Sequence, residues 1–233
     1  MGVPSDARVL GVDACPAGWV GIAIGPRGIQ AYVEELVADL VAAAALDGPL
    51  DAVGVDIPIG LMSDAPRQAD LLAAARIGGL RSSVFTTPVR AALQAPDHAT
   101  ASALNRERAG FGVSVQAYGL ARRIFEVEEW SRSTALNVRE VHPEVSFAEL
   151  AGAPLADRKN SWAGVQHRQA LLAAAGLVLE GDLGLAGRAA KVDDVLDAAA
   201  AAWTASRIAA GTARPIPDPP EQSDDGWPAA IWV

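Results

Sequence analysis

Leu10-Gly11-Val12-Asp13 lies near the start of the chain, and almost the same pattern returns as Val53-Gly54-Val55-Asp56. Each copy is a short apolar run that is typical of a buried strand and that stops at an aspartate. We therefore expect each strand to deliver one carboxylate to the end of a sheet. An aspartate in this place is often only a turn former, but two such endings make coincidence less credible.

A third acidic segment, Asp193-Asp194-Val195-Leu196-Asp197, begins a predicted helix far downstream. The pairs 193/197 and 194/197 each project from roughly one helix face. Aspartates in a first turn also cap the helix and meet its dipole, which is the structural alternative for Asp193. Asp197 sits deeper, beside an apolar stripe that must face the core. Carboxylates gathered from distant segments repel one another unless a hard cation such as Mg²⁺ or Mn²⁺ neutralises them, so we predict a metal site.

The segment Glu140-Val141-His142-Pro143-Glu144 ends another predicted strand. Strand alternation places Glu140 and His142 on one face, and Glu144 follows the proline that ends the pairing. Glu140 and Glu144 are candidate further ligands or catalytic carboxylates. His142 is either a ligand or proton shuttle or, as most lone histidines are, a hydrogen-bonded structural residue.

A run from Arg76 to Arg90 combines glycines, two adjacent hydroxyls and arginines, which suits phosphate or another anion. Its candidate phosphate-binding residues are Arg76, Arg81, Ser82 and Ser83; the alternative is an ordinary surface loop. The run lacks the residue order of a P-loop, and no dinucleotide fingerprint follows a strand. A small-residue loop from Ala14 to Trp19 leaves room above Asp13 for a ligand, with Trp19 as a candidate contact. Lys159 and Arg168 add positive charge that the sequence does not place.

The chain has 233 residues, of which 51% are hydrophobic and 20% charged, and this fits a single domain over residues 1–233. Its only cysteine, Cys15, excludes an internal disulfide and a cysteine-rich zinc module. No stretch approaches the roughly 20 apolar residues that span a bilayer, so we expect no membrane partner and a cytoplasmic location. The net charge of −9 argues against a protein that binds nucleic acid through overall positive charge. Residues 67–139 are an exception, since they hold ten arginines against six acidic residues.

The expected fold is α/β, with a mixed five-stranded sheet, flanking helices and a helical insert at about residues 65–132. Two or three helices are expected in the insert, and a proline-rich extended tail at about residues 211–233, tacked to the body by Trp227 and Trp232. The first three strands should form an antiparallel meander, with the fourth and fifth parallel. The expected strands are 8–12, 18–24, 28–33, 51–57 and 137–141, and the other expected helices are 34–46, 161–175 and 193–210.

These segments together resemble the DUF429 family, predicted nucleases of the ribonuclease H-like fold. The resemblance spans most of the chain and rests on Gly11-Val12-Asp13 with Gly18-Trp19, Asp56 to Leu61, Arg81 to Pro88, Glu140 to Glu144, and Asp193 to Ala198. That fold requires the same coarse order of elements that the spacing predicts.

The resemblance implies that carboxylates on the first strand, the fourth strand and the last helix hold two divalent ions. In this chain they are Asp13, Asp56 and the pair Asp194 and Asp197, the spacing of which is similar to that in RuvC-like resolvases. In the implied mechanism one metal activates water for attack on a phosphodiester and the second stabilises the leaving oxygen, while Arg81 and Ser82 hold the phosphate.

Our functional hypothesis is a metal-dependent phosphodiesterase or nuclease, with nucleic acid as its partner. One alternative is a hydrolase of a nucleotide or another small phosphoester. Another is a binding module that keeps the scaffold without catalysis. Convergence of Asp13, Asp56 and Asp197 would favour an enzyme, a long basic groove would favour nucleic acid, and a closed pocket would favour a small ligand.

Overall fold

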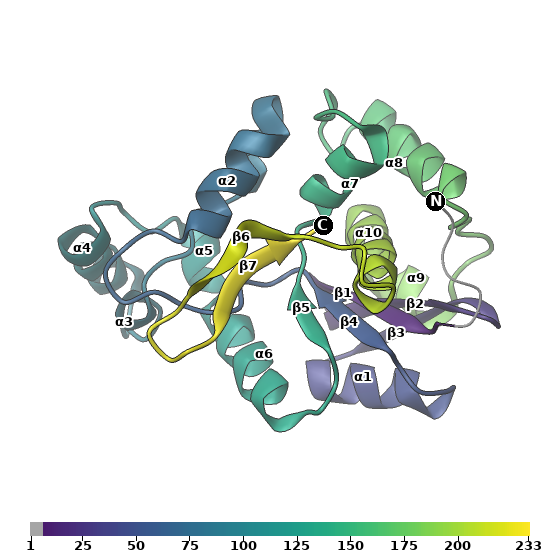
Figure 1. The fold of residues 1–233 in the computed structure, drawn as a ribbon, viewed down its shortest axis with the longest axis horizontal. Helices are drawn as coiled ribbons and strands as arrows, with labels where there is room; N and C mark the ends of the chain where they lie inside the picture. Colours follow the sequence, from purple (N-terminus) through teal and green to yellow (C-terminus); the bar gives the residue numbers. More distant parts are fainter. Residues whose placement is uncertain (1–6) are drawn as a thin grey trace.

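The computed structural model describes residues 7–233 and contains a five-stranded mixed sheet in the order β3-β2-β1-β4-β5 (Figure 1). β1 pairs antiparallel with β2 and β2 with β3, whereas β4 is parallel to β1 and β5 is parallel to β4. The strands are β1 (Val9–Cys15), β2 (Gly18–Gly25), β3 (Gly28–Glu34), β4 (Ala52–Val55) and β5 (Val138–Glu140). The expected α/β class, the meander and the two parallel strands are all confirmed.

Helices cover both faces of the sheet (Figure 1). The long helix α10 (Val192–Ala209) packs against β1, β2 and β4 on one face, and α1 (Val37–Leu46) packs against β2 and β3 on the other. Beyond the sheet lie α7 (Pro143–Ala151), α8 (Trp162–Ala174) and α9 (Gly184–Ala189). The helices expected at 34–46, 161–175 and 193–210 are confirmed to within a few residues, whereas α7 and α9 were not expected.

The sheet has an apolar core on each face, and neighbouring residues of β1 alternate between the two cores. Val9 packs with the alanine-rich face of α10, while Leu10 and Val12 pack with α1 and α6 (Ala121–Ser133). Continuous apolar strands of this kind are typical of a sheet that is covered on both sides. The covering explains why no polar alternation marks these strands in the sequence.

Gly11 and Gly54 let α10 approach the sheet closely. A Cβ atom on Gly11 would lie 2.0 Å from the backbone nitrogen of Ala202, and one on Gly54 would lie 2.8 Å from the backbone oxygen of Ala201. Any side chain at either position would push the helix away from the strands. The glycine in each copy of the repeated pattern therefore sets the depth at which α10, and with it Asp197, sits over the strand ends.

The helical insert between β4 and β5 is confirmed in its place, but the expected two or three helices were too few. It contains α2 (Gln68–Ile77), the 3-10 helix η1 (Gly78–Ser83), α3 (Arg90–Leu93), α4 (His98–Ala109), α5 (Val115–Gly119) and α6. Pro88 lies in the irregular segment between η1 and α3, and the left-handed backbone of Gly110 ends α4. Glycine and proline divide the region more finely than its helical periodicity indicates.

The proline-rich tail is extended, as expected, and it also pairs with itself. β6 (Pro215–Gln222) and β7 (Pro228–Trp232) form a separate two-stranded antiparallel sheet. Trp227 and Trp232 pack against the two cores, which confirms that they tack the tail onto the body. Among residues 7–233, no helix is both long and apolar enough to cross a membrane.

Candidate metal centre

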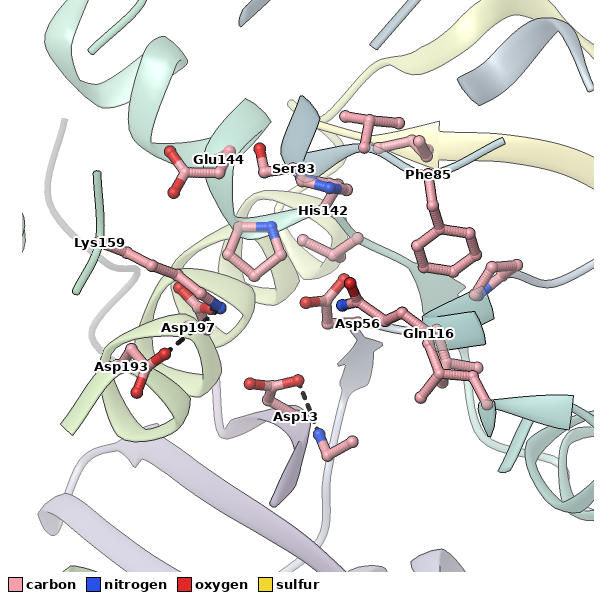
Figure 2. Close-up of a pocket in the computed structure, with 18 of the residues that line it drawn as sticks. Asp13, Asp56, Ser83, Phe85, Gln116, His142, Glu144, Lys159, Asp193 and Asp197 are labelled. Carbon is pink, nitrogen blue, oxygen red and sulfur yellow. Dashed lines mark hydrogen bonds and ion pairs between the residues drawn. The ribbon is translucent and has the colours of Figure 1, made fainter. Parts of the chain in front are cut away.

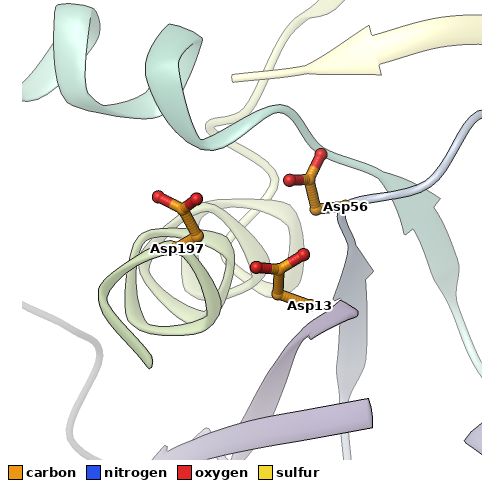
Figure 3. Close-up of side chains that lie close together, drawn as sticks. All are labelled: Asp13, Asp56 and Asp197. Carbon is orange, nitrogen blue, oxygen red and sulfur yellow. The ribbon is translucent and has the colours of Figure 1, made fainter. Parts of the chain in front are cut away.

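Three aspartates from distant parts of the chain converge beside the ends of β1 and β4 (Figure 3). Asp13 lies near the end of β1, Asp56 directly follows β4, and Asp197 lies in the second turn of α10. One oxygen from each carboxylate lies within 4.8 Å of the others. Asp13 and Asp197 are buried, and Asp56 is partly buried. The predicted convergence of these three residues is therefore present.

The strand register accounts for the first two members of the group. Val12 is the parallel partner of Val55, and the Asp56 amide donates a 2.9 Å hydrogen bond to the Val12 carbonyl. The two copies of the pattern thus run side by side, and each ends in its aspartate at the same edge of the sheet. Parallel strands place their carboxyl ends together in this way, which is why such edges commonly carry sites.

The three carboxylates are electrostatically unfavourable to one another. Burial, followed by the charges of Asp56 and Asp197, raises the pKa of Asp13 well above its usual range. Burial also raises the pKa values of Asp56 and Asp197 to about 7. Groups that resist ionisation because of burial and mutual repulsion are candidates for a functional site, since a cation bound between them would relieve both costs.

Lys159 supplies a positive charge within the cluster (Figure 2). Its ammonium nitrogen donates a 2.5 Å hydrogen bond to Asp197 Oδ2 and lies 3.8 Å from Asp193 Oδ2. Burial alone would lower the pKa of Lys159, but the charge of Asp197 and the hydrogen bond to it raise that pKa above its ordinary value. Lys159 comes from the connection between α7 and α8, whose position could not be deduced from the sequence.

Comparison with known proteins places most of the chain in one family. The family model DUF429, described as a protein of unknown function, matches residues 11–222. The chain belongs to the DUF429 family. The search of curated proteins and the search of solved structures each found no match.

The cluster of Asp13, Asp56 and Asp197 in this DUF429 chain fits a hard divalent cation. It offers carboxylate oxygens, the ligands that Mg²⁺ and Mn²⁺ prefer. Asp197 Oδ1 is buried and has no hydrogen-bond partner among the described residues. A buried acceptor without a donor costs free energy, and a cation would satisfy it. Asp13 Oδ1 accepts a 2.6 Å hydrogen bond from the Ala14 amide, which holds its carboxylate in place.

The other predicted acidic residues line the same cavity, but each has a partner of its own. Asp194 Oδ2 accepts a hydrogen bond from the Lys191 amide and caps α10. Glu140 Oε2 accepts from Arg67 at 2.6 Å and from the Ile59 amide at 2.7 Å. Burial raises the pKa of Glu140 to about 7 in spite of the arginine.

Glu144 is held by the second of the two basic residues that the sequence could not place. Arg168 is fully buried and contacts both Glu144 oxygens, at 2.6 and 2.7 Å. Both contacts come from the one nitrogen Nη2, and this charge-assisted interaction orients the carboxylate and gives each of its oxygens a donor. Of the predicted acidic residues, the structure thus gathers Asp13, Asp56 and Asp197 into one group, while Asp194, Glu140 and Glu144 point to other partners.

The predicted phosphate-binding residues divide between the cavity and the rest of the surface. Ser82 and Ser83, from η1, line the cavity, whereas Arg76, Arg81 and Trp19 do not. Arg76 pairs with Glu149 on α7. Trp19 is buried and donates from Nε1 to Glu126 on α6 at 2.9 Å, so its role is to join the second strand to the helices.

The cavity over the aspartates has a volume of about 570 Å³. Several of its lining residues were not singled out from the sequence, among them Gln116, Arg123, Arg158 and Asn160. They come from the insert and from the loop before α8, where no motif marks them. His142 also lines the cavity; burial lowers its pKa, which favours the neutral imidazole.

Proposed function

We propose that this chain is a divalent-metal-dependent phosphodiester hydrolase, a nuclease on a ribonuclease H-like scaffold. The observation that carries the proposal is the convergence of Asp13, Asp56 and Asp197 within 4.8 Å. The strand order β3-β2-β1-β4-β5, with a carboxylate-bearing last helix over it, agrees with the scaffold that the family resemblance implies. The proposed cofactor is Mg²⁺ or Mn²⁺, held by these three aspartates.

The chemistry of the cavity supports a phosphoester as substrate. A divalent ion at the carboxylates would polarise a phosphoryl oxygen and lower the pKa of a bound water. The hydroxyls of Ser82 and Ser83 can donate to phosphate oxygens, and the guanidinium groups of Arg123 and Arg158 can offset phosphate charge. Hydroxyl donors, arginine side chains and the three aspartates thus line the same cavity.

A second candidate function, hydrolysis of a nucleotide or another small phosphoester, is favoured by the size of the cavity. Its volume of about 570 Å³ lies inside the range of roughly 300–1,000 Å³ that is typical of small-molecule sites. The net charge of −9 also suits a small ligand better than a long polyanion.

The test is calorimetric titration of Mn²⁺ into the wild type, Asp13→Asn and the control Asp39→Asn. The same samples are then incubated with labelled single-stranded, duplex and hybrid oligonucleotides, with free nucleotides and with bis(p-nitrophenyl) phosphate. Asp39 is exposed and lies on α1, which covers the face of the sheet opposite to α10. Asp39→Asn therefore makes the same change of charge as Asp13→Asn, but outside the aspartate cluster.

We expect metal binding and metal-dependent cleavage of an oligonucleotide, both lost in Asp13→Asn and kept in Asp39→Asn. Cleavage of nucleotides or of the small diester alone would support the second candidate. Metal binding without cleavage of any substrate would contradict both hydrolase proposals, and absence of metal binding would contradict the metal site itself.

A further inference from the structure

Lys159 is the one cation that contacts the aspartate group among the described residues, and its partners are specific. Its ammonium bonds Asp197 Oδ2 at 2.5 Å, while Asp197 Oδ1 stays buried without a partner. Asp197 therefore presents one oxygen to a charged side chain and has a second oxygen still to be satisfied. Lys159 thus already supplies one cation to Asp197, and the unsatisfied Oδ1 atom can ligate one further cation.

Most of the nearby acidic side chains that could hold another ion have partners of their own. Glu140 is paired with Arg67, Glu144 with Arg168, and Asp194 with the Lys191 amide. Asp193 also lines the cavity, and its Oδ2 lies 3.8 Å from the Lys159 ammonium, so it faces the same cation as Asp197. When they are ionised, Asp13, Asp56 and Asp197 together with Lys159 carry two negative charges. The remainder of two negative charges matches a single divalent ion, whereas two such ions would leave the centre strongly positive.

We propose that the Lys159 ammonium takes the place of a second metal ion, so that Asp13, Asp56 and Asp197 bind one divalent cation per chain. This inference rests on the proposed metal-dependent function and narrows the two ions that the family resemblance implies to one. The proposal also gives Lys159 a role in binding the substrate. The ammonium lines the cavity and is anchored by Asp197, where it can meet a phosphoester oxygen without an additional metal.

Lysine 159 can be tested cleanly because the chain has only one other lysine, Lys191. Lys191 precedes α10 and is exposed. Lys159→Met removes the charge and keeps most of the length of the side chain, Lys159→Arg keeps the charge, and Lys191→Met removes the same charge outside the centre. Thermal melts first establish that each variant is folded.

The measurement is the number of Mn²⁺ ions bound per chain by calorimetry, with electron paramagnetic resonance to detect two coupled ions. We expect one ion in the wild type, in Lys159→Arg and in Lys191→Met, and two ions in Lys159→Met. Two ions in the wild type would mean that Lys159 moves aside, and one ion in Lys159→Met would mean that it fills no cation position. Either result overturns the inference and leaves the proposed metal-dependent function intact. Absence of any bound metal would overturn both.

Discussion

Gly11 and Gly54 are partners in adjacent parallel strands, and both lie against the backbone of α10. The two positions differ in how much space remains. A Cβ atom would lie 2.0 Å from a helix backbone atom at Gly11 and 2.8 Å from one at Gly54. The repeated glycine therefore has a structural function that is distinct from that of the aspartate that follows it.

Gly11→Ala should destabilise the protein by about 3 kcal/mol or more, since neither backbone can yield without moving a whole element. Gly54→Ala should cost less, because its closest approach is longer. Urea denaturation of both variants, compared with wild type, measures the two costs. A Gly11→Ala variant with unchanged stability would show that α10 does not pack as described.

The stability of the metal-free protein should fall as the pH rises from about 4 to above 7. The folded-state pKa values of Asp56 and Asp197 are raised to about 7, so the folded protein binds more protons than the unfolded chain over that interval. Their contribution is complete below the unfolded pKa of about 3.9 and is lost as the pH rises through the folded values. Urea denaturation in the presence of a chelator, at several pH values, measures this slope.

Asp56→Asn should flatten that pH dependence and stabilise the metal-free protein at pH 8, since it removes a charge that the other two aspartates repel. Asp39→Asn, which changes an exposed carboxylate, should leave the slope as it is in the wild type. An equal slope in all three proteins would contradict the electrostatic account of the cluster.

Divalent metal should stabilise the folded wild type. A ligand at one hundred times its dissociation constant adds about 2.7 kcal/mol, which corresponds to a rise of roughly 5–10 °C in Tm for a chain of this size. Melting with Mn²⁺ and with excess chelator measures the difference. Asp197→Asn should abolish it, because the variant loses a ligand; a rise of equal size in that variant would indicate that the metal binds elsewhere.

Arg168→Met should destabilise the protein by about 3–5 kcal/mol, because it leaves the Glu144 carboxylate buried and uncompensated. The double variant with Glu144→Gln should recover part of that loss, since the unpaired charge is then gone. A double-mutant cycle by urea denaturation tests this coupling. Additive effects would show that the pair is not coupled.

Much of the architecture could be predicted because its signals are local. Apolar runs ending at Asp13 and Asp56 predict strands, and the alanine-rich segment after Asp197 predicts a helix, so three members of the cluster follow from pattern alone. Lys159 could not be placed, since it lies in an irregular connection whose path depends on packing. The partners of Glu140 and Glu144 were equally hidden, because Arg67 and Arg168 reach them through tertiary contacts.

The aspartate group spans nearly the whole chain, from β1 to the last helix, and this has a consequence for biosynthesis. During synthesis Asp13 and Asp56 emerge from the ribosome early, whereas Asp197 emerges only with α10. The same helix covers one face of the sheet. Contacts so distant in sequence carry a high cost in loop-closure entropy and cannot form before both segments have been synthesised. A nascent or prematurely terminated chain therefore carries two of the three aspartates, and the proposed metal site is complete only when α10 has been synthesised.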